Sequence, residues 1–138
     1  MKQHPFSIVE EGCVVEDDVV IGSCVFVGRG SLIGAGTRIQ HGAFIARGSI
    51  IGHHVFIGPN VVLTDDAYPK AGNKDYVRQP PVLQDHCSIG AGAVILPGVT
   101  VHHHTLVGAG AVVTSTVPPN ATVRGVPGRV FLTDAYHN

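Results

Sequence analysis

The chain has 138 residues, a length that suits a single domain. Only 14% of the residues are charged and the formal net charge is −1, so nothing indicates a nucleic-acid partner, and so little charge favours an oligomer that hides part of the surface. The apolar runs are too short to span a membrane and no secretory leader is visible, so we expect a cytoplasmic protein with no membrane partner.

From Val9 onward an aliphatic residue recurs at every sixth position. The full series is Val9, Val15, Ile21, Val27, Ile33, Ile39, Ile45, Ile51, Ile57 and Leu63, then Leu83, Ile89, Ile95, Val101, Val107 and Val113. A period of six fits neither an amphipathic helix, with 3.6 residues per turn, nor an alternating strand. Hexapeptide repeats are typical of a β-helix, so the sequence predicts an all-β, single-stranded parallel β-helix.

A second position of the repeat supports this prediction. Two residues before each aliphatic residue stands a small or β-branched one, such as Val19, Ser31 or Ala43, and residues two apart in a strand face the same side. Cys13 and Cys87 occupy this position and are therefore expected to be small buried hydrophobes rather than nucleophiles. Glycines fill the turn positions, so the GxG strings are predicted to be corners and not a dinucleotide fingerprint.

Three hexapeptides per coil make a triangular prism, and sixteen hexapeptides predict slightly over five coils, in residues 9–63 and 83–118. Residues 64–82, TDDAYPKAGNKDYVRQPPV, break the period and are predicted to form an external loop. A long irregular excursion in so regular a chain is usually functional, although a plain solvated loop remains the alternative. Residues 119–138 are expected to form a C-terminal tail of the single domain.

The period also aligns the histidines. If the loop is a bulge at one corner, Ile51, Leu83 and Val101 stack on one face in consecutive coils. The corner after them then carries five histidines along one edge of the prism: His53, His54, His86, His103 and His104. Three interpretations stay open, namely solvated turn residues, a general base, or a metal site shared between subunits. His86 is the best candidate for the base, because it follows the loop most closely.

Two motifs carry a resemblance to a known family. The stretch GPNVVLTDDAYPK at 58–70 and the stretch VGAGAVVTSTVPPNATVRGVPGRV at 107–130 resemble the hexapeptide-repeat acyltransferases. Within these, the chain is most similar to the nucleotide-sugar N-acetyltransferases of bacterial surface-polysaccharide biosynthesis. The resemblance implies a left-handed β-helix and a homotrimer that binds acetyl-coenzyme A between adjacent subunits, with the loop shaping the sugar pocket and no metal required.

The resemblance and the chemistry of the residues together suggest roles in the site. Asp65 stands where the family has asparagine, and with His86 it is the catalytic candidate, because a carboxylate can attract an ammonium or accept its proton. The expected substrate-binding residues are Asp66, Tyr68, Lys70 and Arg78, and the expected cofactor-binding residues are Gly90, Ala91, Gly108, Ala109, Arg124 and Arg129.

The predicted function is transfer of an acetyl group from acetyl-coenzyme A to the amine of a nucleotide-linked amino sugar. An O-acetyltransferase is the first alternative, but such enzymes carry a histidine where this chain has Tyr68, a poor base at neutral pH. A γ-type carbonic anhydrase is the second, but Pro59 and Thr64 occupy its zinc-ligand positions. A non-catalytic scaffold is the third, and it would need neither the loop nor the cofactor-type tail.

Overall fold

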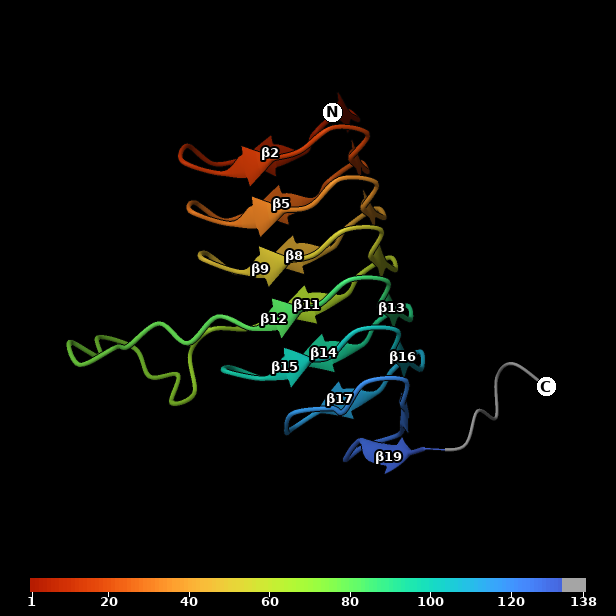
Figure 1. The fold of residues 1–138 in the computed structure, drawn as a ribbon. Coiled ribbons are helices and arrows are strands. Elements are labelled where there is room, and N and C mark those ends of the chain that lie inside the picture. The colour runs from red at the N-terminus through yellow and green to blue at the C-terminus, as the bar shows by residue number, and fades with distance from the viewer. Residues whose placement is uncertain (133–138) are drawn as a thin grey trace.

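Short parallel strands stack into three flat sheets in the computed structural model, which describes residues 1–132 (Figure 1). Sheet A contains, in spatial order, β1 (Lys2–Gln3), β4 (Val20–Ile21), β7 (Arg38–Ile39), β10 (Phe56–Ile57), β13 (Ser88–Ile89), β16 (Leu106–Val107), β18 (Thr122–Arg124) and β19 (Arg129–Phe131). Sheet B contains β17 (Val112–Val113), β14 (Val94–Ile95), β11 (Val62–Leu63), β8 (Phe44–Ile45), β5 (Phe26–Val27) and β2 (Ile8–Val9). Sheet C contains β15 (Thr100–Val101), β12 (Val82–Leu83), β9 (Ile50–Ile51), β6 (Leu32–Ile33) and β3 (Val14–Val15).

The fold is the predicted left-handed parallel β-helix, and the chain visits its three sheets in turn. We call its edges by the sheets they join: the A–B edge, the B–C edge and the C–A edge. Val20 pairs with Arg38, which is 38 − 20 = 18 residues further on, so each coil consists of three hexapeptides. No helix in residues 1–132 is long and apolar enough to cross a membrane.

The number of coils is larger than predicted. Seven parallel strands stack in sheet A before β19 turns back antiparallel, so the solenoid has about seven layers rather than slightly over five coils. The aliphatic series misses the first layer because Gln3, which pairs with Ile21, is polar at the open end of the prism. The series also misses the last layer, because the spacing of six residues is not kept between Val113 and Val123, which pairs with Val107. The expected tail thus begins with part of the last coil, and its residues 133–138 lie outside the described residues.

The aliphatic series forms the core of the prism. Its members from Ile21 to Val113 are buried, and the small residues two positions earlier fill the space between them. The buried hydroxyl groups donate to backbone carbonyls, as Ser31 Oγ does to Gly28 O at 2.7 Å and Ser49 Oγ to Ala46 O at 2.6 Å. A narrow core can therefore hold serine and threonine without an unpaired polar group.

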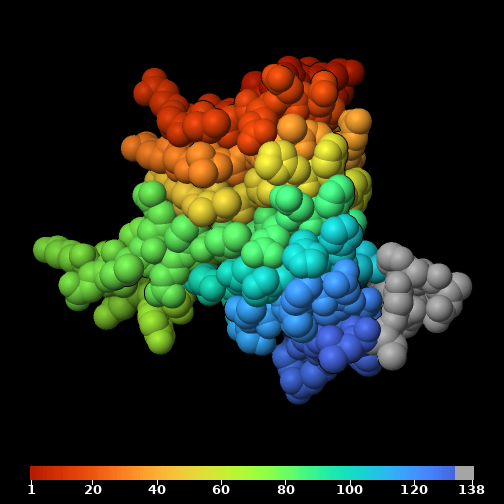
Figure 2. Space-filling model, in the orientation of Figure 1, coloured from red at the N-terminus to blue at the C-terminus, as the bar shows by residue number. Residues whose placement is uncertain are grey.

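The loop interrupts the prism without disturbing its register. Leu83 pairs with Ile51 on one side and Val101 on the other, as predicted, although 83 − 51 = 32 residues separate the first pair. Residues 64–81, which we call the arm, leave the prism at the B–C edge and extend far beyond it (Figures 1 and 2). The neck of the arm is closed by two hydrogen bonds: Gln79 N donates to Asp65 O and Gly98 N to Gln79 O, both at 2.8 Å.

Candidate functional site

The arm and the outer surface of sheet B enclose a pocket of about 580 Å³. We call it the arm pocket. Its lining consists of an apolar floor from sheet B and polar side chains from the arm and the B–C edge: Phe26, Phe44, Ala46, Arg47, Asp65, Asp66, Lys70, Gly72, Asn73 and Tyr76. Three of the predicted site residues, Asp65, Asp66 and Lys70, are therefore brought together here.

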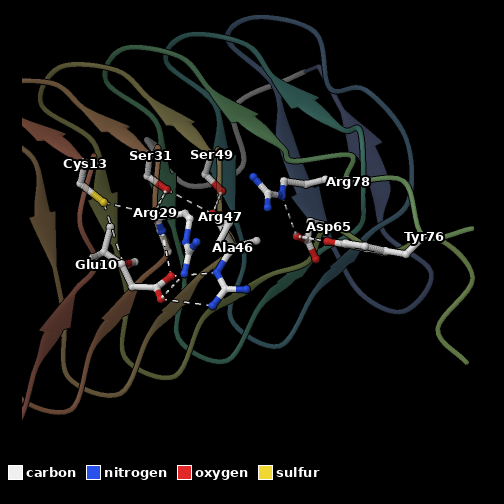
Figure 3. A network of polar contacts seen from close by, with 12 residues as sticks. Glu10, Cys13, Arg29, Ser31, Ala46, Arg47, Ser49, Asp65, Tyr76 and Arg78 are labelled. Carbon is white, nitrogen blue, oxygen red and sulfur yellow. Dashed lines mark hydrogen bonds and ion pairs between the residues drawn. The ribbon is translucent and has the colours of Figure 1, made fainter. Parts of the chain in front are cut away.

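Asp65 is held through both its backbone and its side chain. It lies two residues after the end of β11, and the neck hydrogen bond from Gln79 holds its backbone. Its side chain is 22% exposed; Oδ2 accepts a hydrogen bond of 2.5 Å from the Tyr76 hydroxyl and lies 3.9 Å from Arg78 Nε (Figure 3). The carboxylate is therefore held at the junction of arm and prism instead of being free in solvent.

Tyr76 is a residue of the site that the sequence did not reveal. Its hydrogen bond to Asp65 raises the pKa of the phenol, so the hydroxyl stays protonated and acts as a donor. The arm has no period, and only its folding brings Tyr76 back against a residue eleven positions earlier. An aromatic residue in an irregular loop was the only available signal, and it pointed to no partner.

The other predicted substrate-binding residues have different surroundings. Asp66 Oδ1 accepts a hydrogen bond of 3.0 Å from Tyr68 N, which forms a turn at the start of the arm. The Tyr68 side chain is exposed and does not line the arm pocket, whereas Lys70 does. Arg78 lies beside Asp65 at the neck, so its charge partly balances that carboxylate.

A cluster of charged side chains along the B–C edge was also not revealed by the sequence. Arg47 donates from Nε to Glu10 Oε1 at 2.8 Å and from Nη2 to Glu10 Oε2 at 3.1 Å, and Arg29 N donates to Glu10 Oε1 at 3.0 Å (Figure 3). The hydrogen bonds from Arg47 and then from the Arg29 backbone lower the pKa of Glu10 to about 2. Glu10 and Arg47 are 37 residues apart, but two coils of the prism bring them together.

The predicted histidine column is present at the C–A edge. The ring centroids of His54 and His86 lie 5.3 Å apart and those of His86 and His104 lie 4.8 Å apart, with nearly parallel planes in both pairs. All three histidines have a positive φ, between 54° and 63°. This turn position requires the left-handed region, which costs a non-glycine residue free energy. His86 and His104 also line a shallow groove of about 410 Å³ on sheet C.

The remaining two histidines of the column lie one position earlier in their turns. His53 interacts with Glu16 through Nε2 at 3.2 Å and with Asp85 through Nδ1 at 3.4 Å. The hydrogen bonds to Asp85 and Glu16 raise the pKa of His53, and the backbone N–H of His53 lowers the pKa of Asp85. His103 Nδ1 lies 3.1 Å from His104 Nδ1, so one of these two rings donates to the other.

Within residues 1–132 no group of three or more His, Cys, Asp or Glu side chains is placed to hold a metal ion.

The two catalytic candidates do not meet within one chain. Asp65 follows β11 and lies at the B–C edge, whereas His86 follows β12 and lies at the C–A edge. The width of sheet C separates them, although only twenty residues separate them in the sequence. Closeness along the chain was therefore a poor guide, because a coil turns a corner every six residues.

The expected cofactor residues lie at the third edge and at the end of the prism. Gly90, Ala91, Gly108 and Ala109 stack at the A–B edge in consecutive coils. Gly90 allows a close approach, since a Cβ on it would lie 2.5 Å from Ala109 N. Arg124 and Arg129 pair across β18 and β19, and the Arg124 guanidinium lies 4.3 Å from the centre of the Phe131 ring.

The cysteines differ in their exposure. Cys87 is buried, its Sγ donates to His102 O at 2.9 Å, and burial raises the pKa of its thiol to about 11. This confirms the expectation of a small buried hydrophobe for Cys87. Cys13 is half-buried and Cys24 is exposed.

Comparison with solved structures shows which proteins share this prism. The chain is similar to a maltose O-acetyltransferase from Clostridium difficile, with a TM-score of 0.78 and 24% identity over 88% of this chain and 70% of that one, a likeness that concerns the fold alone. It is also similar to a hexapeptide-repeat acetyltransferase from Vibrio cholerae solved with acetyl-coenzyme A, with a TM-score of 0.76 and 28% identity over 89% and 72%. PerB from Caulobacter crescentus, solved with coenzyme A and GDP-perosamine, has a TM-score of 0.51 and 27% identity over 91% and 56%.

Comparison with sequence families gives a more direct result. No curated protein matches the chain significantly. The family profile described as bacterial transferase hexapeptide, six repeats, matches residues 30–65 and 80–115, together more than half of the chain. The two matched segments are the coils on either side of the arm. The chain therefore belongs to the bacterial transferase hexapeptide family.

Proposed function

We propose that the protein transfers an acetyl group from acetyl-coenzyme A to the amine of a nucleotide-linked amino sugar. The amine nitrogen attacks the thioester carbonyl, the C–S bond breaks, and the products are an acetamide and the free thiol of coenzyme A. The observation that carries the proposal is the position of the Asp65 carboxylate. Asp65 lines the arm pocket, its backbone is held at the neck of the arm, and its side chain accepts a hydrogen bond from Tyr76. Support for the cosubstrate comes from the acetyltransferase of Vibrio cholerae, solved with acetyl-coenzyme A.

Asp65 is the residue that binds the acceptor amine. Within the described residues its Oδ2 carries the hydrogen bond from Tyr76, whereas its Oδ1 makes none. An ammonium group is a strong donor to such an oxygen, so the carboxylate attracts the acceptor and holds its nitrogen in the pocket. Asp66 and Lys70 complete the polar wall, with Arg78 beside Asp65 and Tyr68 at the rim.

His86 is the proposed general base. Its ring lies in the middle of a stack of three imidazoles, 5.3 Å from His54 and 4.8 Å from His104, and imidazole is the side chain most often used for proton transfer. A base at this edge must receive its substrate from another chain, because Asp65 of the same chain lies across sheet C.

The proposed assembly is a homotrimer with sites between subunits. Two observations support it. The arm extends away from its own prism (Figure 1), as a segment that reaches a neighbour would. Sheet C also presents an apolar outer surface, since Val14, Leu32 and Ile50 are all exposed. In this assembly Gly90, Ala91, Gly108 and Ala109 form the edge along which the body of the cofactor lies, and Arg124 and Arg129 bind its phosphorylated end.

A screen of acceptors tests the proposal. Purified protein is incubated with acetyl-coenzyme A and a panel of nucleotide-linked amino sugars, together with the hydroxyl analogue of each, and release of free thiol is followed. We expect turnover with at least one amino sugar and at least tenfold less with its hydroxyl analogue. Turnover of the hydroxyl analogues alone would identify an O-acetyltransferase, and no turnover with any acceptor would contradict both functions.

For His86 the pH dependence of the rate is the test. His86→Asn should remove an acidic limb from the pH–rate profile, on which the rate falls as the base becomes protonated, because asparagine cannot take up a proton. An unchanged profile in that variant would remove His86 from the mechanism.

A further inference from the structure

The arm pocket contains a fixed cation that does not come from the arm. Arg47 follows β8 at the B–C edge and lines the pocket beside Asp65 and Tyr76. Its Nε and Nη2 both donate to Glu10, and within the described residues its Nη1 has no hydrogen-bond partner. One end of the guanidinium is thus anchored, and the other is available to a ligand.

The anchor itself is well held. Glu10 also accepts from the backbone N–H of Arg29, and the Arg29 side chain lies 3.7 Å from Glu10 Oε2. The stem of Arg47 crosses directly over Gly28 in the previous coil, where an added Cβ would lie 2.5 Å from both Arg47 N and Arg47 Cγ. The Arg47 side chain is therefore positioned before any ligand arrives, which lowers the entropy cost of binding.

The pocket combines charged side chains from the arm, namely Asp65, Asp66 and Lys70, with Arg47 from the prism and an apolar floor. Asp65 is acidic at the arm, Arg47 is basic at the prism, and the rings of Phe26 and Phe44 stack at 5.1 Å on the floor. A neutral sugar would offer no cation to Asp65 Oδ1 and no anion to Arg47 Nη1, the two atoms of these groups that make no hydrogen bond within the described residues. A molecule with an amine at one end and an anion at the other would satisfy both.

We propose that Arg47, oriented by Glu10, binds a phosphate of the acceptor while the amine of the same acceptor meets Asp65. The inference rests on the proposed function and adds to it the residue that selects phosphate-bearing acceptors. Arg78 is less suited to this task because it does not line the arm pocket. Planar guanidinium groups are the preferred partners of phosphate oxygens in proteins.

The test compares three acceptors that share one amino sugar, two with phosphate and one without: a nucleoside-diphosphate amino sugar, the amino sugar 1-phosphate and the free amino sugar. For Arg47→Gln we expect kcat/KM to fall at least about tenfold with the two phosphate-bearing acceptors, and less than about twofold with the free amino sugar. Glu10→Gln keeps a hydrogen-bond acceptor without its charge and should give a smaller loss of the same selectivity. Arg38→Gln is the matched control, since Arg38 is an exposed arginine on sheet A outside the arm pocket.

Two results would overturn the assignment of Arg47: an equal loss with all three acceptors, or no loss with any. If the wild-type protein acetylates none of them, the proposed function fails, and calorimetric binding of UDP then decides the subsite by itself. Binding of UDP that weakens at least tenfold in Arg47→Gln supports the subsite, and binding that is absent or unchanged contradicts it. Equal melting temperatures of wild type and variants establish that the substitutions leave the prism folded.

Discussion

Replacing Asp65 by asparagine is the most direct test of the site. The substitution preserves the shape of the side chain, and the amide oxygen can still accept the hydrogen bond from Tyr76. It removes the negative charge that faces the amine of the acceptor. It also restores the residue that the resembled sugar N-acetyltransferases have at this position, so it separates the need for a charge from the need for a polar group.

The size of the effect follows from the contact that is lost. A hydrogen bond to a charged group contributes about 1.5–3 kcal/mol. The Asp65 side chain is 22% exposed and Arg78 lies 3.9 Å from it, so solvent and the neighbouring cation weaken its attraction for an ammonium, and the lower half of that range applies. We therefore expect kcat/KM for the amino sugar to fall roughly 10- to 40-fold, at about 1.4 kcal/mol per factor of ten.

The assay is thiol release at saturating acetyl-coenzyme A, with urea unfolding to verify stability. Asp75→Asn is the matched control, because Asp75 is an exposed aspartate of the same arm that does not line the pocket. Activity of Asp65→Asn equal to that of wild type would refute a role for the charge. An equal loss with the hydroxyl analogue would show that Asp65 does not act through the amine.

Three further predictions concern stability and reactivity. Leu83→Ala removes a fully buried side chain of the coil next to the arm and should lower the free energy of unfolding by about 2–5 kcal/mol in urea, whereas Val77→Ala, in the exposed arm, should change it by less than about 0.5 kcal/mol. In a thiol titration of the folded protein at pH 8, Cys24 should react and Cys87 should not, because Cys87 is buried and its pKa is about 11; rapid reaction of the Cys24→Ser variant at Cys87 would contradict this. The pKa of His53 is raised above 6.5 by its carboxylate partners, so its stabilisation is complete below pH 6.5 and is lost as the pH rises through the folded pKa; His53→Asn should abolish this part of the pH dependence of unfolding, and a dependence that persists would exclude His53 as its source.

The prism could be predicted from the sequence because its rules are local. Each inward aliphatic residue lies six residues from the next, and a shift of one residue would turn the whole series toward solvent. This is why the alignment of Leu83 with Ile51 could be predicted across the arm, and with it the stack of His54, His86 and His104. The first layer was not predicted because Gln3 occupies the open end of the prism, where burying an apolar residue would contribute little free energy.

The candidate site could be predicted only in part. The break in the period located the arm, and its charged residues pointed to Asp65, Asp66 and Lys70, which the structure brings into one pocket. Neither Tyr76 nor Arg47 could be found in this way. Tyr76 reaches Asp65 through the folding of an aperiodic segment, and Arg47 occupies an ordinary turn position.

By itself the sequence determined the coil, its register and the place where the coil is interrupted, because a strict period constrains every inward position independently of the rest of the chain. Only the tertiary structure decided which polar groups meet. It brought Glu10 to Arg47 across 37 residues, and it placed Asp65 and His86 on different edges. Contacts of this kind depend on where distant segments lie in space, and the spacing of residues along the chain does not determine them.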